Sequence, residues 1–82
     1  MTTKILVIDD DVAITELMNM LLKTHGFEVF TTNSGVEGVK LVEEHRPSVV
    51  LLDLMMPDMD GWQVCKAVRS FNNVPILILS AI

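Results

Sequence analysis

Oxygen-bearing side chains stand directly after three apolar stretches of this 82-residue sequence. Asp9 and Asp10 follow the first stretch, Asp53 follows the second and Ser80 the third. A single Asp at the end of an apolar run is more often a loop cap than a ligand. Several carboxylates gathered at one place, however, favour binding of a hard cation that prefers oxygen ligands. The question is therefore whether the fold brings these side chains together.

The apolar stretches have the pattern of strands buried on both faces, which is typical of parallel sheets. Between them, apolar residues recur at helical spacing, as on the predicted apolar face of the first helix: Ile14, Leu17, Met18, Leu21 and Leu22. The predicted elements are a strand over 4–8, a helix over 12–25, a strand over 27–31, a helix to 45 after Ser34, a strand over 49–53, a helix over 61–70 and a strand over 74–80. This βαβαβαβ order implies right-handed crossovers and a parallel sheet. Ligands bind at the carboxyl ends of such strands, where the oxygen-bearing side chains should meet.

Polar side chains also stand where the predicted helices begin. Asp10 or Asp11 would cap the first helix, and Gly26 would end it in a left-handed conformation. Ser34 and Glu37 match a capping box, in which each side chain bonds the backbone N–H of the other residue. The remaining acidic loop residues are interpreted as caps or solvated side chains rather than as ligands: Asp11, Asp58 and Asp60.

Composition limits the class of protein. The length suits one small domain. The single cysteine, Cys65, offers no intramolecular disulfide, which favours a reducing cytoplasm. The apolar runs fall far short of the roughly 20 residues that a membrane helix needs. A formal net charge of −5 without a Lys/Arg cluster speaks against direct binding of nucleic acid. We therefore expect a soluble, cytoplasmic protein.

Three segments together resemble the receiver domain of response regulators in two-component signalling. They are 5–11, 51–61 and 75–81, and the resemblance extends over the whole chain. The middle segment, which reads LLDLMMPDMDG, is the most specific. The resemblance implies a flavodoxin-like α/β fold, a doubly wound parallel sheet with the strand order 2-1-3-4.

The resemblance also implies a role for each acidic residue at the sheet edge. Asp53 would be the phosphoacceptor, which takes a phosphoryl group from a sensor histidine kinase or a phosphotransfer protein. Asp10 and Asp53 would bind Mg²⁺ together with the backbone carbonyl of Met55, and Asp9 would support them. The chain would then be a phosphorylated signalling module and not an enzyme.

Other contacts that the resemblance implies lie at the end of the sequence. Ser80 would be the hydroxyl switch that hydrogen-bonds the phosphoryl group, and the Ala81 N–H would be a second donor. The family continues through a fifth strand that carries a Lys, and through two further helices, whereas this sequence stops at Ile82 without a Lys after Ser80. Residues 1–82 are therefore expected to be only the N-terminal part of a receiver domain.

The sequence leaves two alternative functions open. The chain could be a receiver fragment that is not competent for phosphorylation and acts through self-association or partner binding. Its fourth strand, over 74–79, would be an apolar edge without a charged residue, and we expect it to join two copies antiparallel across a two-fold axis. A nucleotide- or flavin-binding half-domain is the weaker alternative, because the run 9–11 repels phosphate where glycines would be needed.

Overall fold

The structure is a computed structural model, and it describes residues 2–79 of the chain. Within that range the chain forms four strands and three helices, in the predicted order. Their bounds are β1 Lys4–Ile8, α1 Val12–Thr24, β2 Glu28–Thr32, α2 Gly35–His45, β3 Val49–Asp53, α3 Gly61–Arg69 and β4 Ile76–Leu79. None of the helices in this range is long and apolar enough to cross a membrane.

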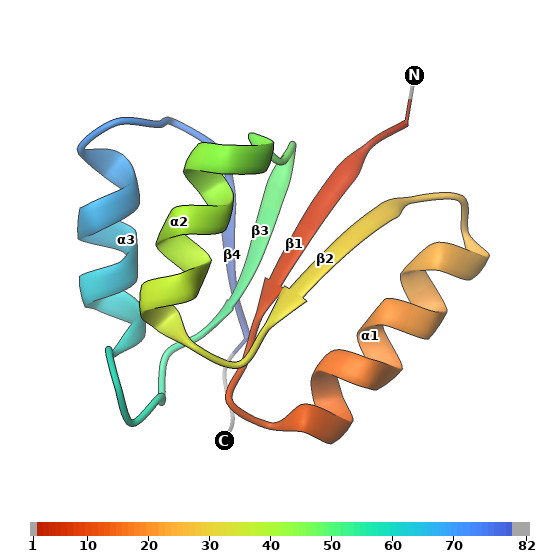
Figure 1. Cartoon of the computed structure of the whole chain (residues 1–82), viewed down its shortest axis with the longest axis horizontal. Coiled ribbons are helices and arrows are strands. Elements are labelled where there is room, and N and C mark those ends of the chain that lie inside the picture. Colours follow the sequence, from red (N-terminus) through yellow and green to blue (C-terminus); the bar gives the residue numbers. More distant parts are fainter. Residues whose placement is uncertain (1, 80–82) are drawn as a thin grey trace.

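The strands of residues 2–79 form one parallel sheet in the order β2-β1-β3-β4 (Figure 1). β1 lies in the middle, where Ile5 pairs with Val29 of β2 and with Val49 of β3. The α/β class and the strand order 2-1-3-4 that the sequence predicted are thus confirmed. Because β1 and β3 are parallel neighbours, the residues that follow them lie at the same edge of the sheet.

The main core lies between the sheet and the helices α2 and α3, which share one face (Figure 1). Alternate residues of a strand point to the same face. The fully buried residues of this layer are Leu6, Ile8, Val50 and Leu52 from the sheet, Val42 from α2, and Val64 and Val68 from α3. Glycines allow close contact here: a Cβ at Gly38 would lie 2.5 Å from Ile8 Cδ1, and one at Gly61 would lie 2.6 Å from the Cα of Leu54.

α1 lies on the opposite face of the sheet, against β1 and β2 (Figure 1). Thr15 is the one buried residue of this helix, all of which is described. Leu17 and Leu21 belong to its predicted apolar face, yet they are 50% and 48% exposed. The helix is where the sequence predicted it, but its apolar face is only partly covered, because no second helix of residues 2–79 packs beside it.

Helix caps agree with the sequence at both ends of α1. The Asp11 carboxylate accepts the Ala13 N–H at 2.9 Å, which settles the choice between Asp10 and Asp11. Gly26 follows the helix with a φ of 88°, a left-handed conformation that favours glycine.

The predicted capping box of α2 needs a correction. Ser34 Oγ accepts the Glu37 N–H at 3.2 Å, but the reciprocal bond is not among the caps of α2. The Ser34 N–H, which the Glu37 side chain would have to bond, donates to Thr32 Oγ1 at 3.2 Å, and the Ser34 hydroxyl donates to Asp58 at 2.9 Å. The complete box is in α3, where the Asp60 carboxylate accepts the Gln63 N–H at 2.9 Å and the Gln63 side chain accepts the Asp60 N–H at 3.0 Å.

β4 is shorter than predicted, because it begins at Ile76 and not at Val74. The Val74 N–H donates to the Asn72 side chain at 2.7 Å, and Pro75 has no N–H to offer a sheet. Within residues 2–79, β4 has a neighbour on one side only, and Leu77 is 57% exposed. β4 is therefore an open edge strand of the described chain.

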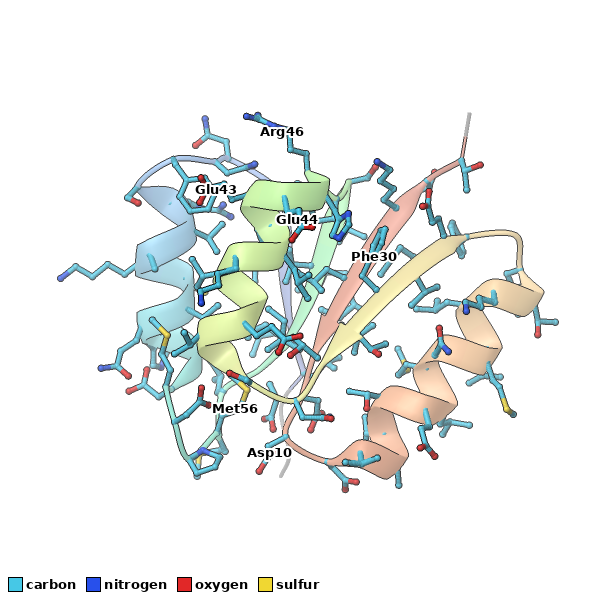
Figure 2. All side chains as sticks on the ribbon, viewed as in Figure 1. Asp10, Phe30, Glu43, Glu44, Arg46 and Met56 are labelled. Atoms are coloured by element: carbon cyan, nitrogen blue, oxygen red, sulfur yellow. The ribbon has the colours of Figure 1, made fainter. Side chains whose placement is uncertain are left out.

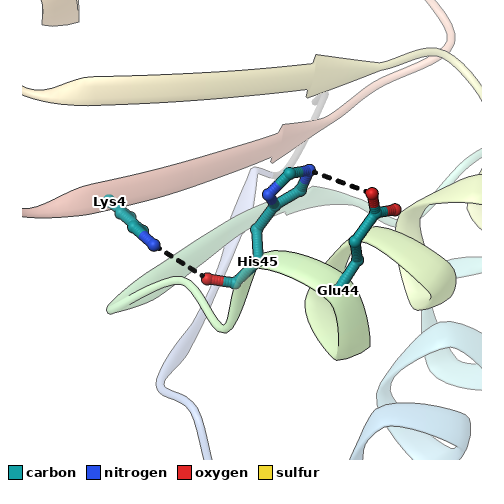
Figure 3. A network of polar contacts seen from close by, with 3 residues as sticks. All are labelled: Lys4, Glu44 and His45. Atoms are coloured by element: carbon teal, nitrogen blue, oxygen red, sulfur yellow. Dashed lines mark hydrogen bonds and ion pairs between the residues drawn. The ribbon is translucent and has the colours of Figure 1, made fainter.

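A small polar network ties α2 to the sheet at the end opposite the strand-terminal Asp residues (Figure 3). Lys4 Nζ donates to the His45 carbonyl at 3.4 Å, and His45 Nε2 lies 3.9 Å from a Glu44 oxygen. The His45 ring also stacks on Phe30, with 4.1 Å between centroids, where β2 faces α2 (Figure 2). A cation near the last carbonyls of a helix is favourable, so this network anchors α2.

Candidate metal centre

Asp9, Asp10 and Asp53 form an acidic cluster at the carboxyl ends of β1 and β3. Each contributes an oxygen, and these oxygens all lie within 4.8 Å of one another. Asp9 and Asp53 are buried, whereas Asp10 is exposed where the chain leaves β1 (Figure 2). The cluster opens into a hollow of about 700 Å³. The strand-end carboxylates therefore meet in space, while their use as metal ligands stays a prediction.

Two backbone hydrogen bonds orient the buried carboxylates of the acidic cluster. The Asp11 N–H donates to Asp9 Oδ1 at 2.9 Å, and the Met55 N–H donates to Asp53 Oδ1 at 3.1 Å. Each bond spans two residues, so it fixes both the carboxylate and the start of the loop that leaves the strand. Each carboxylate keeps its second oxygen for another ligand.

The acidic cluster does not favour full ionisation by itself. Burial raises the pKa of Asp9 above its ordinary value, and repulsion by Asp53, Asp10 and Asp11 raises it further. The Asp11 N–H bond opposes this rise in pKa without cancelling it. A divalent cation would relieve both the burial and the repulsion. The cluster fits Mg²⁺, which takes oxygen ligands and commonly one or two carboxylates.

Asp9→Asn should stabilise the metal-free chain at pH 7 by on the order of 1 kcal/mol. The amide oxygen can still accept the Asp11 N–H, whereas the buried charge is gone. Because the pKa of Asp9 is raised on folding, the folded chain binds this proton more readily than the unfolded chain. The free-energy penalty is therefore complete above the folded-state pKa, decreases as the pH falls below it and is gone below the unfolded-state pKa. Urea unfolding in EDTA across a pH series measures the effect.

Asp11→Asn is the matched control for this measurement. Asp11 is exposed, and its amide oxygen can still cap α1. We expect a change in unfolding free energy within about 0.5 kcal/mol at every pH. An equal gain in both variants would assign the effect to net charge and not to the acidic cluster.

The other predicted site residues are only partly described. Met55 lines the hollow beside the acidic cluster, and its side chain is 74% exposed. Ser80 and Ala81, the predicted contacts of the phosphoryl group, lie outside the described residues. No Lys follows Ser80 in the sequence, where Lys66 is the last one.

The β2–α2 junction, residues 32–36, was missed by the sequence interpretation although it contacts both loops of the acidic cluster. Asn33 donates to the backbone of Asp9, and the start of α2 binds the Asp58 carboxylate. These contacts join residues that are far apart in the sequence, so no local spacing indicates them. The available signals were Ser34, predicted as a cap of its own helix only, and Asp58, interpreted as a cap or a solvated side chain.

A parallel α/β sheet with carboxylates at the ends of two neighbouring strands defines a ligand-binding edge of the doubly wound class. Comparison with known families identifies the class more closely, because residues 5–82 match the response regulator receiver domain. The chain belongs to this family.

Relatives agree with this assignment. The DNA-binding response regulator MtrA of Mycobacterium tuberculosis (strain ATCC 25618 / H37Rv) is 41% identical over 81 residues, which are 99% of this chain and 36% of that protein. The transcriptional regulatory protein CpxR homolog of Haemophilus influenzae is 44% identical over 80 residues, 96% of this chain and 34% of that protein. The chain thus spans about a third of the length of these relatives.

Solved structures agree with the fold. The BeF3-activated receiver domain of Klebsiella pneumoniae RstA superposes with a TM-score of 0.90 at 29% identity, over 98% of this chain and 68% of that one. The chemotaxis protein CheY4 of Vibrio cholerae gives a TM-score of 0.87 at 32% identity, over 95% and 68% of the two chains. The described residues therefore have the fold of a receiver domain.

Proposed function

We propose that this chain is a phosphoacceptor module of a two-component system, in which Asp53 takes a phosphoryl group from a phosphohistidine. The observation that carries the proposal is the position of Asp53, a buried carboxylate held by the Met55 N–H next to Asp9 and Asp10. The donor is a sensor histidine kinase or a phosphotransfer protein. Membership of the receiver family supports this partner class.

In the proposed reaction a carboxylate oxygen of Asp53 attacks the phosphorus atom. The new O–P bond forms while the N–P bond to the donor imidazole breaks, and the released imidazole nitrogen takes up a proton. The product is an acyl phosphate on Asp53. The chain is itself the phosphoryl acceptor and does not act as an enzyme on a separate substrate.

The acidic cluster would repel an incoming phosphoryl group unless a cation were present. Mg²⁺, when bound, supplies a compact positive charge that carboxylate and phosphoryl oxygens can share. Asp10 and Asp53 would hold it with the Met55 carbonyl, and Asp9 would support them. We expect weak affinity, because the hollow is open and Mg²⁺ keeps several of its waters.

Titration with beryllofluoride, a phosphoryl mimic, in the presence of Mg²⁺ tests this proposal. The amide signals of Asp11 and Met55 should shift in a saturable way, because both N–H groups bond carboxylates of the acidic cluster. Omission of Mg²⁺ should prevent the shift, and so should Asp53→Asn. A wild-type chain that shows no saturable shift would contradict a phosphoacceptor role.

A second candidate function is self-association, which the open edge at β4 favours. Leu77 and Ile78 of this strand are 57% and 37% exposed, and the strand carries no charged residue. Such edges pair with other chains unless a charge or a cover prevents it. We propose that two copies of the 82-residue chain pair antiparallel through β4 across a two-fold axis.

Leu77→Lys should convert this dimer into a monomer, because a lysine on an edge strand opposes strand pairing. Leu77 is more than half exposed, so the change leaves the core intact. Light scattering at micromolar concentration measures the mass. Leu21→Lys on α1, where Leu21 is 48% exposed, is the control and should stay dimeric. A monomeric wild type, or a dimer that only Leu21→Lys disrupts, would contradict pairing through β4.

Binding of nucleic acid and location in the cell are considered separately for this segment. DNA binding is named for MtrA, of which this chain spans 36%. We propose that this segment does not itself bind nucleic acid, since it has a net charge of −5 and six basic residues. A cytoplasmic location is proposed from its single cysteine.

A further inference from the structure

The first arm of the β2–α2 junction reaches the loop after β1. Asn33 Nδ2 donates to the Asp9 carbonyl at 2.8 Å and to Thr15 Oγ1 at 3.1 Å. Thr15 is buried and its hydroxyl donates to the Val12 carbonyl at 3.0 Å, so this anchor is itself fixed. On the other side, the Asp9 N–H donates to the Thr32 carbonyl at 3.1 Å. The junction therefore holds the backbone of Asp9 at both of its polar groups.

The second arm of the β2–α2 junction reaches the loop after β3. The Asp58 carboxylate accepts three hydrogen bonds from it, from Ser34 Oγ at 2.9 Å and from the Gly35 and Val36 N–H groups at 3.3 Å each. The Ser34 bond, followed by the bonds from Val36 and Gly35, holds the pKa of Asp58 below its ordinary value. Asp58 thus satisfies the open N–H groups of a helix to which it does not belong.

Packing confirms that the loop after β3 lies directly on the start of α2. A Cβ at Gly35 would lie 3.0 Å from Met59 Cβ and 3.1 Å from the Met59 carbonyl, so a larger residue would push the loop away. The loop is also held at its two ends, by the bond from Met55 to Asp53 and by the capping box at Asp60. Asp58 is its attachment in the middle.

We propose that Asn33 and Asp58 are positioning residues, through which the β2–α2 junction braces the two loops of the acidic cluster in one relative arrangement. Asn33 sets the place of the Asp9 backbone, and Asp58 sets the place of the loop that carries the Met55 carbonyl. Neither belongs to the acidic cluster, so neither is treated as a ligand. The part of the inference that concerns Mg²⁺ affinity rests on the proposed function.

Amide hydrogen exchange of the metal-free chain tests the brace without any ligand, because it measures local opening. Asn33→Ala should speed exchange of the Asp11 amide, and Asp58→Ala should speed exchange of the Met55 amide, each by roughly tenfold. Each variant should leave the other amide within about twofold of its wild-type rate. This crossed pattern is specific, because a general loss of stability would speed both amides in both variants.

Mg²⁺ affinity is the second measurement, made by calorimetry well below the melting temperature. Each alanine variant should raise the Mg²⁺ dissociation constant about tenfold, the lower end of the effect of outer-shell groups on metal affinity. Asp58→Asn should recover most of the loss, because its amide oxygen can still accept N–H bonds. Asn73→Ala and Glu37→Gln, which change an exposed amide and an exposed carboxylate whose side chains lie outside these contacts, are the controls and should bind like wild type.

The outcomes separate the inference from the proposed function. Wild-type exchange at both amides in both alanine variants would overturn the brace. Unchanged Mg²⁺ affinity together with a lower melting temperature would also overturn it, since the two residues would then serve stability alone. If the crossed exchange pattern appears but the wild-type chain binds no Mg²⁺, the brace stands and the proposed function fails.

Discussion

Asp53→Asn is expected to abolish labelling of the chain by a phosphohistidine donor or by a small-molecule phosphodonor, with a loss of at least about a hundredfold, or 2.7 kcal/mol in the barrier. The amide is neutral and a poor nucleophile, so the O–P bond cannot form there. Its shape is nearly the same, and its oxygen can still accept the Met55 N–H that bonds Asp53 Oδ1 at 3.1 Å. Mass spectrometry of the intact chain measures the label.

Two variants control for the loss of one negative charge. Asp11→Asn and Asp58→Asn change exposed carboxylates and should keep the label. Label that persists in Asp53→Asn would move the acceptor to another carboxylate, with Asp10 the first to test by peptide mapping. Absence of label from the wild type would instead favour self-association, the second candidate function.

Asp10→Asn is expected to weaken Mg²⁺ binding by roughly a hundredfold, about 2.7 kcal/mol. Asp10 is the exposed member of the acidic cluster, with an oxygen within 4.8 Å of those of Asp9 and Asp53. The substitution removes a charged ligand for a hard cation while it leaves the core untouched. Calorimetric titration of Mg²⁺ at constant ionic strength measures the change.

Asp58→Asn is the control for the effect of Asp10→Asn on Mg²⁺ affinity. It also removes one carboxylate, but its amide oxygen can still accept bonds from α2, so we expect no more than about a threefold change in affinity. Equal small effects of Asp10→Asn and Asp58→Asn would show that the metal binds elsewhere or not at all.

Most of the fold could be predicted because its signals are local. The apolar run before Asp9 is a strand buried on both faces, and the run before Asp53 is a strand buried on one face and half-buried on the other. Gly26 and Asp60 stand at helix ends as their chemistry predicts. The strand order came from the family resemblance and is confirmed. The extent of β4 could not be predicted, because it depends on whether the Val74 N–H joins the sheet or bonds Asn72.

The position of the acidic cluster followed from topology, since β1 and β3 end at one edge of the sheet. The contacts around the acidic cluster could not be predicted from the topology. The Ser34 N–H donates to Thr32 Oγ1 and not to the Glu37 side chain. The Ser34 hydroxyl donates to Asp58, which depends on how the loop after β3 packs against α2 in the folded chain. The exposure of Leu17 likewise depends on what packs against α1, and the spacing of apolar residues in the sequence does not predict that.

The central place of β1 has a consequence for the nascent chain. Of the described strands, β1 leaves the ribosome before the others and can pair with β2 as soon as α1 has formed, but its other edge pairs Ile5 with Val49 of β3. Synthesis of residues 9–53, which form α1, β2, α2, β3 and their loops, at about 5–20 residues per second takes several seconds. During that time the apolar edge of β1 is open, and such edges attract other chains. Aggregation during expression should therefore depend on how soon β3 follows, and slow codons between 33 and 48 should increase it.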